Sequence, residues 1–197
     1  MPNSPLVVIL AGPNGAGKST AAPSLLRDSF GVDEFVNADA IALGLSSFAP
    51  EGVALEAGRI TLERLNALAL KRARFAFETT LAGRFFARWT RDLMAVGYQS
   101  YLLFLSLPSA EAAIQRVANR VSLGGHNIPL ETIERRFRAG LHNFFRLYRP
   151  IVTSWMFFDN SFADAPKLLA KGRASSSLEV FDGETYGRFL KEFGNEQ

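Results

Sequence analysis

The stretch Gly12-Pro-Asn-Gly-Ala-Gly-Lys-Ser-Thr20 decides the fold that the sequence predicts. It follows the apolar run Leu6–Leu10 and opens a predicted helix over residues 18–28. A glycine-rich loop that ends in Lys-Ser between a strand and a helix is the pattern of a P-loop. Its glycines let backbone N–H groups turn toward phosphate oxygens, and the helix N-terminus adds a favourable dipole. The alternative, a glycine-rich turn with a chance lysine, explains neither flanking element.

The side chains at the end of this loop have separate predicted roles. Lys18 is expected to reach the outer phosphates of a nucleoside triphosphate, and the Ser19 hydroxyl is expected to bind Mg²⁺. The sequence therefore predicts ATP and Mg²⁺ as cofactors. The predicted cofactor-binding residues are Gly12, Pro13, Asn14, Gly15, Ala16, Gly17, Lys18, Ser19 and Thr20.

Composition places the chain among ordinary globular proteins. Of its 197 residues, 48% are hydrophobic and 21% are charged, and none is cysteine. We expect one domain over residues 1–197, without disulfides or a thiolate zinc site. No apolar run approaches the roughly 18 residues that span a bilayer, and the N-terminus lacks the basic region of a signal peptide. No membrane partner is expected, and the use of ATP predicts a cytoplasmic location.

The charge distribution argues against a nucleic-acid partner. The net charge is +3, which suits an anionic ligand but forms no dense basic stripe. Nucleic-acid-binding proteins more often carry such a stripe interleaved with aromatic residues. The aromatic residues of the predicted helix 130–148 instead recur with aliphatic ones at helical spacing, which indicates core packing. These residues are Ile133, Phe137, Leu141, Phe144 and Tyr148.

Apolar segments alternate with helical segments along the chain, which predicts an α/β fold with a mostly parallel sheet. Ligands of such sheets bind at the carboxyl ends of the strands, so functional side chains are expected there. A helix near 162–171, an edge strand at 178–181 and a short helix from Gly183 are expected to finish the chain. The earlier strands are expected at 6–11, 34–38, 74–79, 100–107 and 154–159, and the earlier helices at 18–28, 50–72, 83–96, 109–121 and 130–148.

Asp39 follows the second predicted strand, in Val36-Asn-Ala-Asp39. Its carboxylate is placed to accept the proton of a substrate hydroxyl that attacks the γ-phosphate of ATP. Asp is also a preferred N-cap residue, and a helix is expected to begin at Ala40-Ile41. Position in the sequence favours neither role over the other.

Glu78 ends the third predicted strand, where buried aromatic residues give way to polar ones in Phe75-Ala-Phe-Glu-Thr-Thr80. We interpret it as a ligand of the substrate or of hydrated Mg²⁺, with the Thr80 hydroxyl beside it. The alternative is a carboxylate that caps the next helix. The fourth strand ends in Leu105-Ser-Leu-Pro108, without the acid that many motor ATPases carry there. A small kinase in which Asp39 or Glu78 supplies the carboxylate is therefore favoured.

Residues 116–138 carry arginines on both sides of a glycine pair. Arg116 and Arg120 share one helix face at i, i+4 spacing, before the break at Ser122-Leu-Gly-Gly-His-Asn-Ile-Pro129. A hinged segment of this kind can close over ATP, spread positive charge around the γ-phosphate and exclude water. We interpret it as a lid, although a solvated basic helix face has the same pattern. His126 fits loop hydrogen bonding and ligand contact equally. The second helix carries Arg135, Arg136 and Arg138.

Together these motifs resemble the zeta toxin family of P-loop kinases, over Leu6 to about Asn160. The resemblance implies a three-layer P-loop fold with sheet order 2-3-1-4-5 and helices on both faces. Members studied as toxins phosphorylate the 3′-hydroxyl of the sugar in UDP-N-acetylglucosamine, and a small antitoxin protein restrains them. The ordered series is the loop 12–20, Val36-Asn-Ala-Asp39, Glu56-Ala-Gly-Arg59, Phe77-Glu-Thr-Thr80, Arg116-Val, Arg120-Val, Gly124-Gly-His-Asn-Ile-Pro129 and Asp159-Asn-Ser161.

The motif match implies roles for single residues. Asp39 would be the catalytic base and Lys18 the phosphate ligand. Arg120 and Arg136 would neutralise the transferring phosphoryl group, although the choice of Arg136 over Arg135 stays open. The implied substrate-binding residues are Asp39, Arg59, Glu78 and Thr80.

The chain also departs from the family, because it lacks the extra segments that enlarge the substrate cleft of plasmid-borne toxins. We therefore expect an ATP-dependent kinase whose acceptor is a nucleotide sugar or another small metabolite, such as a nucleoside or a sugar. A nucleotide-dependent regulatory switch is the alternative from a different class; it would use the P-loop but not the base Asp39. A kinase for nucleic-acid ends ranks last, because it needs a basic groove.

Overall fold

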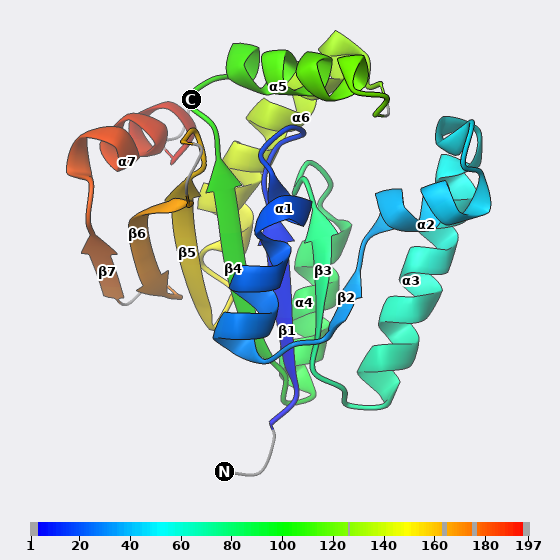
Figure 1. The fold of residues 1–197 in the computed structure, drawn as a ribbon. Helices are drawn as coiled ribbons and strands as arrows, with labels where there is room; N and C mark the ends of the chain where they lie inside the picture. The colour runs from blue at the N-terminus through cyan, green and yellow to red at the C-terminus, as the bar shows by residue number, and fades with distance from the viewer. Residues whose placement is uncertain (1–3, 126, 163–164, 175–176, 195–197) are drawn as a thin grey trace.

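The computed structural model describes residues 4–125, 127–162, 165–174 and 177–194. A seven-stranded sheet forms its centre, in the order β2-β3-β1-β4-β5-β6-β7 (Figure 1). The expected order of the first five strands is confirmed, and these five run parallel. The strands are β1 (Leu6–Ala11), β2 (Glu34–Val36), β3 (Phe75–Thr79), β4 (Gln99–Ser106), β5 (Ser154–Asp159), β6 (Lys167–Arg173) and β7 (Ser177–Val180).

Strand β1 lies inside the sheet, between β3 and β4, and all of its residues are buried. An unbroken apolar run is what a parallel strand covered on both faces requires. The parallel register aligns Leu10 of β1 with Glu78 of β3, and Ala11 with Thr79. The carboxyl ends of these two strands therefore place the start of the P-loop beside Glu78.

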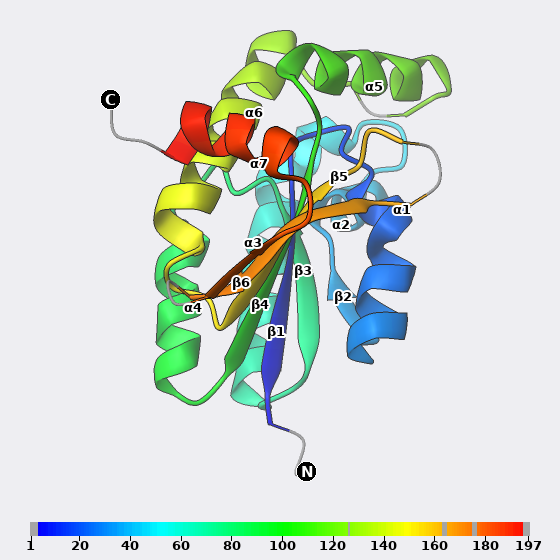
Figure 2. The same ribbon diagram turned by 90° about the vertical axis from the view of Figure 1, so that its left-hand side faces the viewer.

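Helices cover both faces of the sheet, with α1 on one side and α4 on the other (Figure 2). Each of the first five predicted helices forms, with boundaries within a few residues. The predicted helix 50–72 begins as a separate 3-10 turn. The helical elements are α1 (Lys18–Ala22), η1 (Pro23–Asp28), α2 (Ala38–Leu45), η2 (Pro50–Val53), α3 (Ala54–Leu70), α4 (Phe85–Ala95), α5 (Ala110–Ser122), α6 (Leu130–Asn143), η3 (Phe144–Tyr148), α7 (Gly183–Phe189) and η4 (Leu190–Gly194).

The predicted helix at 162–171 is wrong, because Lys167–Arg173 forms strand β6. This strand pairs antiparallel with β5 and with β7. A short apolar run such as Leu168-Leu-Ala170 fits a helix or a strand equally well, and pairing with the open edge of β5 decides between them. Pro166 also favours an extended chain at the residue before it. The predicted edge strand and terminal helix are confirmed as β7 and α7.

Helix α5 lies across the carboxyl ends of the central strands, above the P-loop (Figure 1). Helix α6 returns from there along one face of the sheet, so the connection between them overhangs the expected binding region. Among the described residues, no helix combines the length and apolar character that crossing a bilayer requires.

Candidate active site

The P-loop is held by close backbone contacts at its first glycine. The Gly12 N–H donates a hydrogen bond to the Thr79 carbonyl at 3.2 Å. Gly12 has a φ of +147°, and a Cβ at this position would lie 2.2 Å from the carbonyl oxygen of Leu105. A side chain here would collide with the backbone of β4. Glycine is therefore required for the loop to leave β1 between its two neighbouring strands.

Lys18 is a buried cation at the base of the loop, with 6% of its surface exposed. Its Nζ donates to the carbonyl oxygens of Gly12 and Pro13 at 2.9 Å each, and lies 3.5 Å from Glu78 Oε1. Burial lowers the pKa of Lys18, while the carboxylates of Glu78 and Asp39 oppose that shift. A phosphate group bound in the loop would add negative charge beside the ammonium group and stabilise its protonated form.

Glu78 joins three elements at the end of β3. Its Oε2 accepts hydrogen bonds from Ser19 Oγ at 2.9 Å and from Asn37 Nδ2 at 2.8 Å. The alternative in which Glu78 caps the next helix is wrong, because α4 begins at Phe85 and has Arg84 at its N-cap. The carboxylate instead lies against the P-loop.

Ser19 and Glu78 are the residues that fit Mg²⁺. A hydroxyl and a carboxylate supply hard oxygen ligands, and Mg²⁺ is usually held by one or two carboxylates together with substrate phosphates and water. The described residues contain no group of three or more His, Cys, Asp or Glu side chains that could hold a metal ion. This donor set is therefore suited to an ion that arrives with a nucleotide.

Asn37, rather than Asp39, caps helix α2. The Asn37 side chain accepts hydrogen bonds from the N–H groups of Asp39 at 2.8 Å and Ala40 at 3.2 Å. The capping alternative for Asp39 is therefore wrong. The Asp39 carboxylate extends from the first turn of α2, and the residue lines two cavities that flank the P-loop. Sequence reasoning placed Asn37 at this strand end but missed its capping role.

The first of these cavities, which we call the acceptor cavity, has a volume of about 660 Å³. Its polar end contains the carboxylates of Asp39 and Glu78 together with Lys18. All four predicted substrate-binding residues line it, including Arg59 and Thr80. Its remaining lining includes an apolar wall from α3 and α4, formed by Ala54, Leu55, Gly58, Leu62, Phe85 and Phe86.

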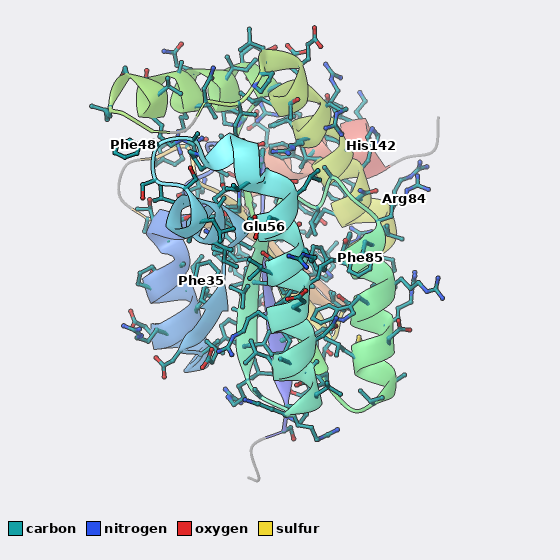
Figure 3. All side chains as sticks on the ribbon, turned by 90° about the vertical axis from the view of Figure 1, so that its right-hand side faces the viewer. Phe35, Phe48, Glu56, Arg84, Phe85 and His142 are labelled. Carbon is teal, nitrogen blue, oxygen red and sulfur yellow. The ribbon has the colours of Figure 1, made fainter. Side chains whose placement is uncertain are left out.

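Sequence reasoning missed this apolar wall. Leu55 is 94% exposed and Phe85 is 57% exposed, although both are large hydrophobic residues. Figure 3 shows Phe85 at the start of α4, on the side where α3 lies. In the sequence, these residues are indistinguishable from core positions at helical spacing. Their exposure beside a cavity makes them candidate binding residues, and this exposure is visible only in the structure.

The arginines of the predicted lid lie at different places around Asp39. Arg136 is half-buried, lines the acceptor cavity, and donates from Nη1 to Asn14 Oδ1 at 3.4 Å. Arg135 and Arg138 on the same helix are exposed. Burial lowers the pKa of Arg136, but a guanidinium group stays charged in proteins.

Arg120 lines the second cavity, of about 590 Å³, together with Ser19 and Asp39. Arg116 lines neither cavity, and its Nη2 donates to the Ser161 carbonyl at 2.8 Å. The structure thus places Arg120 and Arg136 at the two cavities that share Asp39. This is the distribution that neutralising a phosphoryl group from two sides requires.

The glycine pair between α5 and α6 forms a helix cap. Gly124 has a φ of +86°, and its N–H donates to the Val121 carbonyl at 2.9 Å. The Gly125 N–H donates to the Arg120 carbonyl at 2.9 Å. This double hydrogen bond is a Schellman motif, which ends α5 and satisfies its last carbonyl groups. His126 lies outside the described residues.

No family model matches the chain. Over 130 residues the chain is 25% identical to an uncharacterized protein of Haemophilus influenzae. The matched region covers 66% of this chain and 91% of that protein.

Two solved structures share the fold. One is a chain of the AvrRxo1-ORF1:-ORF2 complex with ATP, with a TM-score of 0.75, 16% identity, and coverage of 94% of this chain and 63% of that chain. The other comes from the PezAT chromosomal toxin-antitoxin system of Streptococcus pneumoniae, with a TM-score of 0.65, 14% identity, and coverage of 96% and 86%. The chain spans less than two thirds of the AvrRxo1 structure. The chain therefore shares the α/β P-loop fold of these structures.

Proposed function

We propose that the chain is a kinase that transfers the γ-phosphoryl group of ATP to a hydroxyl group of a small molecule. One observation carries the proposal: the acceptor cavity joins the buried P-loop lysine, Lys18, to an acid, Asp39, and to a half-buried cation, Arg136. A binding module that only senses ATP has no use for an acid and an organic-sized cavity beside the γ-phosphate position. The related AvrRxo1 structure was solved with ATP, which supports the choice of donor.

Each residue has a defined part in the proposed reaction. The P-loop N–H groups and Lys18 bind the phosphates. Ser19 and Glu78 would hold Mg²⁺, which supplies positive charge at the phosphate oxygens when bound. Asp39 accepts the acceptor's hydroxyl proton while the acceptor oxygen bonds to the γ-phosphorus and the bond from phosphorus to the β,γ-bridging oxygen breaks. The products are ADP and a phosphate monoester, and Arg120 and Arg136 offset the charge during transfer.

We propose a nucleotide sugar, such as UDP-N-acetylglucosamine, as the acceptor. The cavity is of the size that holds organic ligands of several hundred daltons. Its apolar wall, with Phe85 and Leu55, suits a planar base, and Arg59 suits an anionic linker such as a diphosphate. Another small hydroxylated metabolite, such as a nucleoside or a sugar, is the alternative acceptor.

An antitoxin is the proposed protein partner. The related PezAT structure belongs to a toxin-antitoxin system, and that likeness supports the proposal. A cytoplasmic location fits the use of ATP.

An ADP-release assay with a panel of acceptors tests the proposed function. The panel contains UDP-N-acetylglucosamine, free sugars, nucleosides and water alone, each with ATP and Mg²⁺. The proposal predicts ADP release that depends on one acceptor and disappears in Asp39→Asn. Asp33→Asn is the matched control, because Asp33 is an exposed acid that pairs with Arg27 and lines neither of the two cavities beside Asp39. ATP binding without acceptor-dependent release across the panel would favour the regulatory switch.

A further inference from the structure

The segment Asp159–Ser161, directly after β5, lies against the P-loop. The Asn160 N–H donates to the Ser106 carbonyl at 3.0 Å, which extends the pairing of β5 with β4. The Asn160 side chain then donates from Nδ2 to the Ala16 carbonyl at 2.7 Å. Ala16 is fully buried within the loop. A side chain distant in sequence thus holds one particular peptide group of the P-loop.

We propose that Asn160 is a positioning residue that aims the Gly17 N–H at the phosphates of the bound nucleotide. The Ala16 carbonyl and the Gly17 N–H belong to the same planar, trans peptide group, so they point in opposite directions. When Asn160 holds the carbonyl on the outer side of the loop, the N–H faces its inner side. The inner side is where P-loop N–H groups bind phosphate oxygens.

Gly17 and Asn160 are in close contact, and each leaves room for the other. A Cβ at position 17 would lie 2.8 Å from Asn160 Nδ2, so a side chain there would displace the asparagine. Gly17 also has a φ of +73°, which glycine adopts without strain. Glycine at position 17 therefore serves both the turn of the loop and the approach of Asn160.

The segment that carries Asn160 is itself fixed at both ends. Asp159 Oδ1 accepts hydrogen bonds from the Ser161 N–H, at 2.9 Å, and from the Ser161 hydroxyl. The Ser161 carbonyl accepts from Arg116 Nη2. Asn160 therefore contacts the loop from a backbone segment that has few alternative conformations. Such pre-organisation is what a positioning residue needs.

The inference rests on nucleotide binding in the proposed function, but not on the identity of the acceptor. We would titrate ¹⁵N-labelled wild type, Asn160→Ala and Asn160→Asp with inorganic pyrophosphate, ADP and adenosine, and follow amide NMR signals. Ser154→Ala is the matched control, because it removes a side-chain hydrogen bond to the Gly172 carbonyl at the opposite end of β5 from the P-loop. Loss of one hydrogen bond predicts roughly three- to tenfold weaker binding of pyrophosphate and ADP in both Asn160 variants. Adenosine binding should be unchanged, and Ser154→Ala should behave as wild type.

The outcomes separate positioning from a purely structural role. Equal losses for adenosine and ADP, or no loss for pyrophosphate, would overturn the inference. The Gly17 amide signal of wild type gives a test that needs no variant: it should shift downfield with pyrophosphate, and an unmoved signal under saturation would also overturn it. Failure of wild type to bind ADP or pyrophosphate at all would instead count against the proposed function itself.

Discussion

The donor and acceptor sides of the site are built in opposite ways. In the proposed reaction, nine consecutive residues, 12–20, form the donor side, where backbone groups and one buried lysine would bind the phosphates. The acceptor cavity takes its lining from α2, α3, β3, α4 and α6, and includes exposed residues such as Leu55 and Phe85. Triphosphate is the same in every ATP, so a short rigid loop suffices. An acceptor differs between kinases, and dispersed side chains can change to suit it.

The largest effect is expected where the two sides meet, at Asp39. Asp39→Asn keeps the size and the helical position but cannot take the hydroxyl proton. We expect kcat to fall by about 10²- to 10⁴-fold, the usual contribution of general-base catalysis. ATP affinity, measured by calorimetry, should be nearly unchanged. Full turnover in the variant would show that Asp39 is not the base, and that another group takes the proton where the donor and acceptor sides meet.

Lys18→Ala should affect the donor side in particular. The change removes a buried cation and leaves the Gly12 and Pro13 carbonyl groups without its hydrogen bonds. Because hydrogen bonds to charged groups contribute about 1.5–3 kcal/mol, ATP binding should weaken by roughly 10- to 150-fold. Equilibrium binding of ADP and ATP measures this loss, while acceptor binding in the absence of nucleotide should persist. An unchanged ATP affinity would contradict the donor-side assignment.

Gly58→Leu should affect the acceptor side in particular. Gly58 lines the acceptor cavity, and a Cβ added there meets no atom within 4 Å, so a leucine fits the helix and fills the cavity. We expect the acceptor KM to rise by about tenfold, with ATP affinity retained, because occupied volume excludes the acceptor. Gly44→Leu in α2 is the control, since it also meets no atom and lines neither cavity. Equal effects of the two changes would place the acceptor elsewhere.

A change remote from both sides should leave both affinities alone and alter only stability. Asp182 caps α7 by accepting from the Thr185 N–H, and it pairs with Lys167 at 2.7 Å. The Lys167 ammonium lowers the pKa of Asp182 from 3.8 to about 2.

Because the folded pKa of Asp182 is lowered, its stabilisation is present above pH 3.8 and is lost as the pH falls toward 2. The free energies of unfolding of wild type and Asp182→Asn, measured with urea, should therefore differ slightly at pH 6 and converge near pH 2. If the difference in free energy of unfolding grew on acidification instead, the stabilising role of the ionised Asp182 would be contradicted. Any change in ATP affinity would show that α7 is not independent of the donor side.

The same contrast explains what could be predicted from the sequence. The P-loop and the α/β class follow from local patterns: a glycine motif, apolar runs and their alternation with helices. The order of the first five strands was implied by the resemblance to the zeta toxin family, because local patterns do not say which strands are neighbours. Strand β6 could not be predicted, because Leu168-Leu-Ala170 is ambiguous and only pairing with β5 decides its conformation. The capping alternative for Asp39 could be excluded only with the structure, which assigns the cap to Asn37; the role of Asp39 as base stays a prediction.

The acceptor cavity was predictable only in its polar half. Asp39, Glu78 and Thr80 stand at strand ends, where polar residues are conspicuous in a sequence. Phe85 and Leu55 belong to amphipathic helices, and nothing in their spacing separates a cavity wall from the core. Asn160 was identifiable as a strand-end residue, but its contact with Ala16 spans 144 residues and depends on the packing of β5 beside β4.

Phosphorus NMR of the protein with ATP, Mg²⁺ and UDP-N-acetylglucosamine tests the central claim most directly. The account predicts a new phosphate monoester resonance that grows as ADP appears, and that is absent with Asp39→Asn. Inorganic phosphate as the sole product, formed equally with and without the sugar nucleotide, would contradict it. The site would then hydrolyse ATP without transferring the phosphoryl group to this acceptor.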